Sequence, residues 1–258
     1  MRYKFTRFKA VSLITIASAI SFSCLYAIPS SRKEVKHNLV SVAEKINRAE
    51  KNIHLYDSLN LDSLSLSKEA FLYAVHGLDS LRAAGVVKND SIISIADYSL
   101  SSCKKRLFVI NLSTGELLFN SLVSHGRNSG KEIATRFSNK LNSFETSLGF
   151  YVTGDTYKGE HGYSLRLQGL EKGINDNAFN RGIVMHSASY VNESLVRSQG
   201  YIGRSLGCPA VPESLHKAII QTIKGGSCFF AYSPDKKYIA HTKMLKSPFE
   251  FVTADSPV

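Results

Sequence analysis

A histidine and a cysteine, His186 and Cys208, are the residues of this sequence best suited to chemistry, and both lie within residues 181–212. A thiol is a useful nucleophile only as thiolate, and a neighbouring imidazole is a common base for generating it. The two residues are too far apart to meet along one strand or helix, so they meet only if their segments face each other across a turn. One interpretation of these residues is therefore a nucleophile, Cys208, with His186 as its general base. The alternatives are a buried structural thiol and a hydrogen-bonded histidine at a strand end.

The segments on either side of this pair are suited to presenting it. The apolar run at residues 182–185 predicts a strand that ends at His186. Residues 203–208 read Gly-Arg-Ser-Leu-Gly-Cys and predict a loop of small residues that presents Cys208. The glycines at Gly203 and Gly207 would let the backbone approach a substrate and point amide N–H groups at a developing oxyanion.

Four further residues are candidates for the site. Arg204 would lower the pKa of the thiol or bind a substrate carboxylate, although a solvated surface arginine fits equally well. Ser205 would form hydrogen bonds within the loop or help to orient His186. His125 and His161 each precede a glycine in loops that could line a substrate cleft, and surface histidines are the alternative.

The loop at 203–210, Gly-Arg-Ser-Leu-Gly-Cys-Pro-Ala, follows His186 after a spacer, and this arrangement resembles the signature of the murein L,D-transpeptidase catalytic domain family. The closest match is the branch whose loop reads Gly-Arg-Ser-x-Gly-Cys-Pro-Ala, and the similarity runs from about Tyr56 to Tyr232. Two positions depart from better known members. Ser187 replaces the glycine after the histidine, and Pro209-Ala210 replaces an apolar-Arg pair after the cysteine, for whose arginine Arg204 is a substitute.

The resemblance implies a mainly β (α+β) catalytic domain, a β-sandwich or barrel, with a helical N-terminal annex. It implies that Cys208 attacks a peptidoglycan stem tetrapeptide and forms a thioester, which passes to an amine of a neighbouring stem as a 3–3 cross-link. His186 would carry the proton, the Ser205 and Gly207 loop would support catalysis, and a carbapenem would acylate Cys208. No metal or organic cofactor is required. Water as acceptor would instead make an L,D-carboxypeptidase or endopeptidase, and a non-catalytic cell-wall-binding module is the alternative from a different class.

The charge balance agrees with an anionic polymer as partner. The 258-residue chain carries a formal net charge of +11. Residues 1–27 hold four basic and no acidic residues, so the remainder carries 28 basic and 21 acidic residues, a net charge of +7. Nucleic acid would attract the same charge, but the sequence shows no basic helix or aromatic-and-basic motif, so we predict no nucleic-acid partner.

The N-terminus predicts export to the periplasm or cell envelope. Four cations precede an apolar run from Ala10 to Ile20, which is the build of a signal peptide over residues 1–27 with cleavage after Ala27. Residues 21–24 could instead form a lipobox, and the protein would associate with the membrane only if Cys24 is lipidated. An uncleaved anchor is the third alternative.

Three cysteines remain if Cys24 is removed: Cys103, Cys208 and Cys228. An odd number in an exported protein leaves at least one thiol free. A disulfide between Cys103 and Cys228 is one alternative. The other is that Cys228, which lies between apolar residues, is a buried small side chain.

The elements that must position the site follow from the spacing of apolar residues. Residues 28–90 form a predicted helical annex, with one amphipathic helix from Ser31 to about Leu55 and another from an N-cap at Ser67 to near Gly85. Residues 91–233 form the catalytic domain and 234–258 a surface extension. A polar loop spans 125–145, and a helix runs from Pro212-Glu213 to Ile223. Predicted strands cover residues 92–98, 106–111, 116–124, 148–152, 163–168, 182–186 and 227–232.

Overall fold

The computed structural model describes residues 47–245 of the chain. The predicted signal peptide, Cys24, most of the first predicted helix and the last part of the C-terminal extension therefore lie outside the described residues. Residues 47–58, at the end of that first helix, are helical. The chain divides into two compact units, Met1–Lys51 and Asn52–Val258, and the second contains all the strands of the described range.

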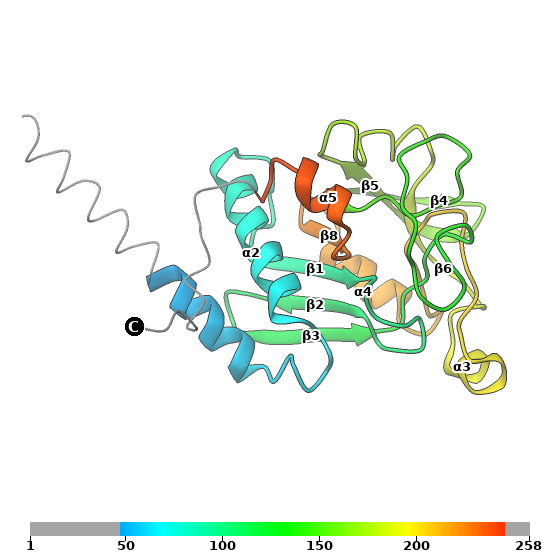
Figure 1. Ribbon diagram of the computed structural model, residues 1–258, viewed down its shortest axis with the longest axis horizontal. Coiled ribbons are helices and arrows are strands. Elements are labelled where there is room, and N and C mark those ends of the chain that lie inside the picture. The colour runs from blue at the N-terminus through cyan, green and yellow to red at the C-terminus, as the bar shows by residue number, and fades with distance from the viewer. Residues whose placement is uncertain (1–46, 246–258) are drawn as a thin grey trace, which may run out of the picture. The chain divides into compact units, whose positions relative to one another are not determined.

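The strands of the second unit form one eight-stranded sheet in the order β3-β2-β1-β8-β4-β5-β6-β7 (Figure 1). Neighbouring strands run antiparallel, except for the parallel pairs β1–β8 and β6–β7. The strands are β1 (Ile92–Asp97), β2 (Leu107–Asn111), β3 (Glu116–Ser121), β4 (Gly149–Gly159), β5 (Gly162–Gly169), β6 (Val184–Ser187), β7 (Ala210–Val211) and β8 (Cys228–Tyr232).

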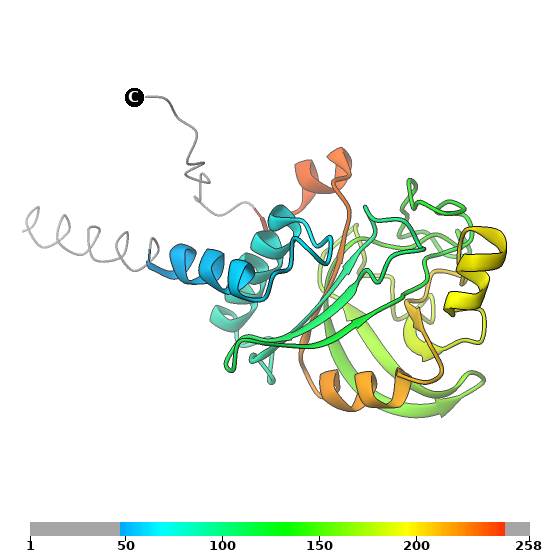
Figure 2. The ribbon, with the colours of Figure 1, turned by 90° about the horizontal axis from the view of Figure 1, so that it is seen from below.

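The two edge strands, β3 and β7, nearly close this sheet into a barrel, and its curvature can be followed in Figure 2. Just beyond β3, the Ser124 N–H donates to the Ala210 carbonyl of β7 at 2.9 Å. The Ala210 N–H in turn donates to the Ser124 hydroxyl at 3.1 Å. The predicted mainly β fold is therefore confirmed, and the closure lies two residues from Cys208.

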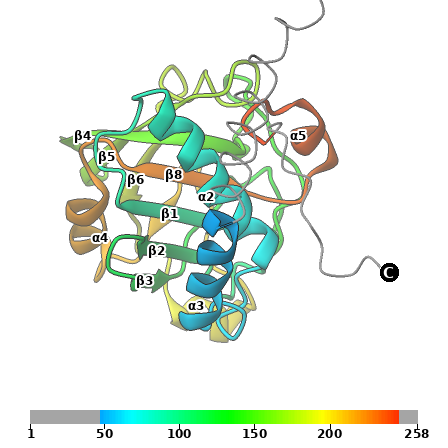
Figure 3. The ribbon, with the colours of Figure 1, turned by 90° about the vertical axis from the view of Figure 1, so that its left-hand side faces the viewer.

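Helix α2 (Lys68–Ala83) packs against β1 and β8 (Figure 3). These two strands are buried along their whole length, which explains why they read as nearly continuous apolar runs. Helix and sheet approach closely at Gly77, where an added Cβ would meet the Phe150 ring at 2.0 Å. Phe150 stacks on Phe230 with ring centroids 4.1 Å apart, so the aromatic core connects α2 to the middle of the sheet.

The limits of α2 follow from its end residues, as predicted. The Ser67 hydroxyl accepts a hydrogen bond from the Ala70 N–H at 3.1 Å, which satisfies one free donor of the first turn. After the last turn, Gly85 takes a left-handed φ of 66°, which ends the helix. None of the helices within residues 47–245 is long and apolar enough to cross a membrane.

Other elements differ from the prediction. Strand β4 continues to Gly159, past a register shift between Thr153 and Thr156, because its polar residues pair with β5 as the outer half of a hairpin. Helix α3 (Glu193–Gln199) was not predicted, since it buries no residue and has no apolar stripe. Helix α4 (His216–Ile223) begins later than the predicted start at Pro212-Glu213. Helix α5 (Lys236–His241) lies inside the predicted extension.

Candidate active site

The Cys208 side chain lies against the start of strand β6. Its Sγ accepts a hydrogen bond from the Val184 N–H at 3.5 Å, and its S–H donates to the Gly182 carbonyl at 3.7 Å. Cys208 is a free thiol and its residue is partly exposed to solvent. The predicted loop therefore does present the cysteine, and the backbone of the histidine strand contacts its sulfur.

Hydrogen bonds fix the loop on both sides of Cys208. The hydroxyl of Ser205 donates to the Cys208 carbonyl at 2.6 Å and accepts from the Gly207 N–H at 3.0 Å. The Ser124 hydroxyl donates to the same carbonyl at 3.3 Å. Ser205 thus forms hydrogen bonds within the loop, which is the first of its two predicted roles.

Gly207 occupies a backbone conformation that favours glycine. Its φ is 123°, and an added Cβ would lie 2.9 Å from the Glu145 carbonyl oxygen. Its amide donates to Ser205, whereas the Cys208 amide has no hydrogen-bond acceptor within residues 47–245. The free hydrogen-bond donor next to the sulfur is therefore the backbone N–H of Cys208 itself.

His186 is buried near the end of β6, and a backbone carbonyl orients its imidazole. Its Nδ1 lies 2.8 Å from the carbonyl oxygen of Ser187. A carbonyl only accepts, so Nδ1 carries the proton and Nε2 is left as the basic nitrogen. This arrangement supplies the orienting partner that a histidine base needs without a carboxylate.

The pairing of β6 with β7 relates the two candidate catalytic residues. His186 pairs with Ala210 in parallel register. Val184 and Cys208 each lie two residues before this pair in their own segments, so the same register places them side by side. No hydrogen bond joins His186 to Cys208 in the part of the chain that the structure describes. Catalytic hydrogen bonds are often long before substrate binds, so strand pairing is the observed link.

His161 lies at the β4–β5 hairpin turn and stacks on His186. The ring centroids are 4.3 Å apart and the ring planes are inclined by 22°. His161 is exposed, while the imidazole it covers is buried. Of the two histidines predicted to line the cleft, His161 is the one in contact with the candidate base.

The surroundings of the thiol and the imidazole favour their neutral forms. Burial raises the pKa of Cys208, and the Val184 N–H and the Arg181 guanidinium oppose that rise. Burial lowers the pKa of His186, the Ser187 carbonyl raises it, and His161 lowers it again. At neutral pH the site therefore holds a thiol and a neutral imidazole, and the proton must leave sulfur as the thiol attacks.

Within residues 47–245, Arg181 is the one charged side chain that affects the thiol pKa, and no pattern in the sequence marks it. Its guanidinium donates to the Ser138 carbonyl at 2.7 Å, to the Ser143 hydroxyl at 3.2 Å and to the Ser147 hydroxyl and Glu145 carbonyl. All four acceptors lie far away in sequence, so no local motif marks this residue.

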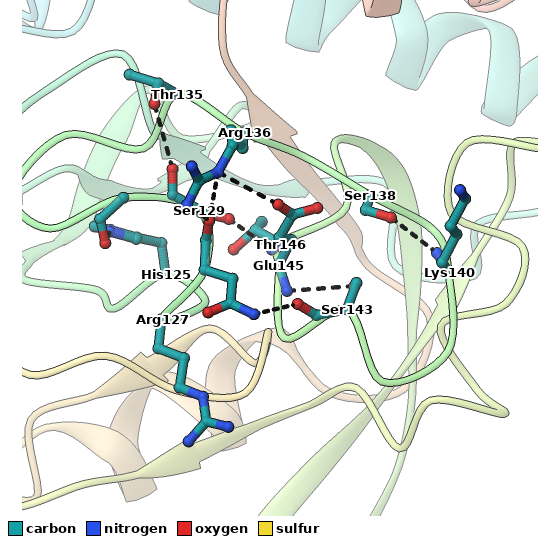
Figure 4. A network of polar contacts seen from close by, with 12 residues as sticks. His125, Arg127, Ser129, Thr135, Arg136, Ser138, Lys140, Ser143, Glu145 and Thr146 are labelled. Carbon is teal, nitrogen blue, oxygen red and sulfur yellow. Dashed lines mark hydrogen bonds and ion pairs between the residues drawn. The ribbon is translucent and has the colours of Figure 1, made fainter.

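The polar loop predicted at 125–145 is a folded segment beside the site (Figure 4). The Ser129 hydroxyl accepts from the Thr146 N–H at 2.9 Å, which joins the two ends of the loop. The Arg136 guanidinium donates to the Asn128 carbonyl and pairs with Glu145 at 3.5 Å. The loop is therefore held by its own polar groups, which explains how a segment with few apolar residues keeps a fixed shape.

His125 is fully buried at the base of this loop. Its Nδ1 lies 2.6 Å from the Arg106 guanidinium and its Nε2 lies 3.2 Å from the Gly130 carbonyl. Burial and the Arg106 cation lower the pKa of His125 to about 3, so it stays neutral. Arg204 donates to the Gly130 and Arg127 carbonyls at 3.3 Å. Both residues hold the loop, and contact of either with substrate stays a prediction.

The other described cysteines are also free thiols. The Cys103 S–H donates to the Gly200 carbonyl at 2.9 Å. Cys228 is fully buried in β8, and burial raises its pKa to about 12. The disulfide between them does not form in this structure, and Cys228 is the small buried side chain that the alternative predicted.

Comparison with known proteins agrees with the motif. A family model described as L,D-transpeptidase catalytic domain matches residues 62–232. A search of curated proteins found no significant match. Similar solved structures include an L,D-transpeptidase from Mycobacterium smegmatis, with 16% identity over 55% of this chain and 59% of that chain and a TM-score of 0.35. Another is the helical cell shape determining protein from Campylobacter jejuni, with 12% identity over 62% of this chain and 54% of that chain and a TM-score of 0.38. The chain spans less than two thirds of the length of both structures.

Proposed function

Because the chain belongs to the L,D-transpeptidase catalytic domain family, we propose that it is a cysteine-dependent L,D-transpeptidase acting on peptidoglycan stem peptides. One observation carries the proposal most strongly. The backbone of β6 contacts the Cys208 sulfur through the Val184 N–H, and the same strand holds His186 with its basic Nε2 left without the proton. The base and its orienting carbonyl therefore lie on β6, and the nucleophile lies in the loop that leads into its partner strand β7.

The first half of the reaction forms an acyl-enzyme. The Cys208 sulfur attacks the carbonyl carbon of the diamino acid at the third position of the stem, and its proton passes to His186 Nε2. The free Cys208 N–H is placed to stabilise the oxyanion. The amide C–N bond then breaks, His186 returns the proton to the leaving amine, and D-alanine departs from a thioester on Cys208.

The second half reverses the proton movements. An amine of a neighbouring stem attacks the thioester carbon, and His186 Nε2 accepts a proton from that amine. The C–S bond breaks, the sulfur regains the proton from His186, and a 3–3 cross-link is released. In each half of the reaction, His186 first accepts a proton as the neutral imidazole and then donates it as the imidazolium. The neutral form must therefore be present at the start, and the lowered pKa of His186 favours it.

Peptidoglycan lies outside the cytoplasmic membrane, so we place this activity in the periplasm or cell envelope. The cationic N-terminal segment followed by an apolar run supports that location. The positive net charge of the chain suits an anionic wall polymer.

Product analysis separates this proposal from its alternatives. Purified protein and its C208A variant would be incubated with purified muropeptides, and the products identified by mass spectrometry. A transpeptidase gives 3–3 cross-linked dimers, a carboxypeptidase gives trimmed tripeptides, and an endopeptidase converts dimers to monomers. A wall-binding module leaves all muropeptides unchanged while it still binds sacculi. Cross-linked dimers formed by the wild type and not by C208A are the expected result.

A further inference from the structure

Arg166 on strand β5 has guanidinium N–H donors that are free within residues 47–245, unlike those of Arg181 and Arg204. Arg181 and Arg204 both donate to backbone carbonyls of the neighbouring loop. The Arg166 guanidinium instead lies over two aromatic rings, with its central carbon 4.5 Å from the Tyr157 ring centroid and 5.7 Å from that of Phe179. Among residues 47–245, no carboxylate lies within ion-pair distance of it.

Strand pairing places this arginine opposite the residue that contacts the thiol. Arg166 pairs with Val184 in antiparallel register, and the Val184 N–H is the group that contacts the Cys208 sulfur at 3.5 Å. Paired Cα atoms of antiparallel strands lie about 5 Å apart. An extended arginine side chain spans a comparable distance, so the guanidinium is within reach of a peptide bound at the sulfur.

The alternation of side chains puts Arg166 on the same face as the catalytic histidine. The neighbouring pair, Leu165 and Met185, is fully buried in the core, so the next residues on both strands point to the other face. Val184 and His186 share that face because they lie two residues apart. Arg166 is exposed there, in contrast to Leu165 beside it.

The two aromatic rings orient the Arg166 guanidinium so that it can bind a planar anion. Stacking on aromatic faces fixes the plane of an arginine while its in-plane N–H donors stay available, and those donors match the two oxygens of a carboxylate. Phe179 is 62% exposed, so this aromatic support of the guanidinium lies at the solvent-facing surface, where a peptide can reach it. A stem peptide supplies carboxylates at the terminal D-alanine and at the second-position D-glutamate.

We propose that Arg166, held between Tyr157 and Phe179, binds a carboxylate of the acyl-donor stem peptide; this inference rests on the function proposed above. Arg127 is the natural comparison, since its guanidinium lies 4.3 Å from the Phe144 ring centroid with its donors also free within residues 47–245, and its backbone N–H donates to the Ser205 carbonyl of the cysteine loop. It offers similar chemistry on the loop side of the site, whereas Arg166 lies on the strand that pairs with the sulfur-binding segment.

The test measures kcat and KM for release of D-alanine by wild type, R166Q, R166K and R127Q, with R197Q on the exposed face of α3 as a surface control. Three substrates are compared: the tetrapeptide, the same peptide with a C-terminal carboxamide, and the same peptide with a carboxamide at the second-position α-carboxyl. We expect R166Q to lose about tenfold or more in kcat/KM on the tetrapeptide, mainly through KM. That loss should vanish on the one substrate that lacks the recognised carboxylate, and R166K should recover part of it.

Equal kinetics of R166Q and wild type on all three substrates, or an equal loss on all three, would overturn the inference, as would a carboxylate-specific loss for R127Q alone. Failure of the proposed cysteine acyl-transfer chemistry is distinguishable, because then the wild type itself releases no D-alanine, whereas a carboxypeptidase would still release it and leave the comparison of variants valid. In that case calorimetric binding of the tetrapeptide to C208A and to C208A/R166Q still decides the matter. The inference requires about tenfold weaker binding by the double variant, and equal affinities contradict it.

Discussion

The residues of the site act through their protonation states as much as through their positions. Cys208 is a thiol with a raised pKa, and His186 is an imidazole with a lowered one. An ion pair of thiolate and imidazolium is therefore disfavoured before substrate binds. In the proposed reaction the nucleophile is generated only when a carbonyl is in place, which would protect the thiol from modification by small electrophiles.

Arg181 is expected to set the reactivity of the thiol. Its cation lowers the pKa of Cys208, so R181M should raise that pKa and slow alkylation of Cys208 severalfold at pH 8, while R181K should retain most of the rate. The measurement is the pH dependence of iodoacetamide labelling, resolved for each cysteine by peptide mapping. Buried Cys228 should stay unlabelled in folded protein. Equal Cys208 rates for R181M, R181K and wild type would show that the guanidinium does not act on the sulfur.

His161 is expected to control the acidic limb of the pH profile. Its ring stacks on His186, and its charge lowers the pKa of His186. A base must be neutral, so activity is lost as pH falls through the His186 pKa. H161F keeps a ring in the stack but removes the charge, and should therefore move the acidic limb of kcat/KM to higher pH. An unchanged limb, with a changed KM alone, would instead assign His161 to substrate binding.

The chemistry of single residues could be predicted from the sequence only where a local motif carries it. Cys208 and His186 stood out by type and spacing. His125 and His161 have the same local context, a histidine before glycine, yet one is buried against Arg106 and the other stacks on His186. Only contacts between distant segments separate them, and those contacts also define the role of Arg181.

At the scale of elements, the closure of the sheet positions the cysteine loop. The Ser124 hydroxyl donates to the Cys208 carbonyl and accepts from the Ala210 N–H. We expect S124A to reduce the free energy of unfolding by about 1 kcal/mol, because the Cys208 carbonyl and the Ala210 N–H each lose one hydrogen bond but keep another partner, and to lower kcat. Urea denaturation and steady-state kinetics measure these effects.

S121A is the matched control for that substitution. Ser121 is equally buried at the end of β3, but its hydroxyl donates only to the carbonyl of the next residue. If S121A lowers kcat as much as S124A does, the link between sheet closure and the cysteine loop is not what the activity depends on.

Helices and strands that bury an apolar face could be predicted from the sequence. Elements without a buried apolar face could not be predicted. Helix α2 and the central strands have clear apolar periodicity and a helix cap at Ser67. Helix α3 buries nothing, and α5 buries only Tyr238, so neither leaves a hydrophobic pattern. The second half of β4 is stabilised by its pairing with β5, which depends on the hairpin and not on composition.

At the scale of the whole molecule, Glu171 joins segments from three parts of the second unit. Its carboxylate accepts the Phe150 N–H of β4 at 2.8 Å and the Tyr238 hydroxyl of α5 at 3.1 Å, and also the Thr242 hydroxyl. Burial raises the pKa of Glu171, although these three donors oppose the rise. The residues that follow β8 are therefore attached to the sheet through a buried acid.

Removing this acid should destabilise the fold. We expect E171A to lower the free energy of unfolding by about 3 kcal/mol at pH 7, because three donors lose their acceptor. E213A, at an exposed glutamate, is the control. Because the folded-state pKa is raised, the protonated acid is favoured by the fold, and its contribution to stability is largest at low pH and falls as pH rises through that pKa. Urea titrations from pH 4 to 8 test both points, and E171A as stable as E213A would contradict them.

The class of the fold could be predicted through the family resemblance, but the arrangement of the strands could not. Strand β8 lies between β1 and β4, so the last strand in sequence occupies the middle of the sheet. Such pairings join segments that are distant in sequence, and neither turn residues nor apolar patterns specify them. The resemblance indicated the architecture because it covers all the strands at once, from about Tyr56 to Tyr232.

The central claim is that Cys208 carries the acyl group, and intact-mass analysis of acid-quenched reactions tests it most directly. Wild-type protein mixed with stem tetrapeptide should gain the mass of the tetrapeptide less D-alanine, and peptide mapping should place that thioester on Cys208. C208A should show no adduct and at least about a hundredfold less D-alanine release, since its fold keeps the loop but lacks the nucleophile. An adduct mapped to Cys103, or turnover by C208A within about tenfold of wild type, would contradict the account.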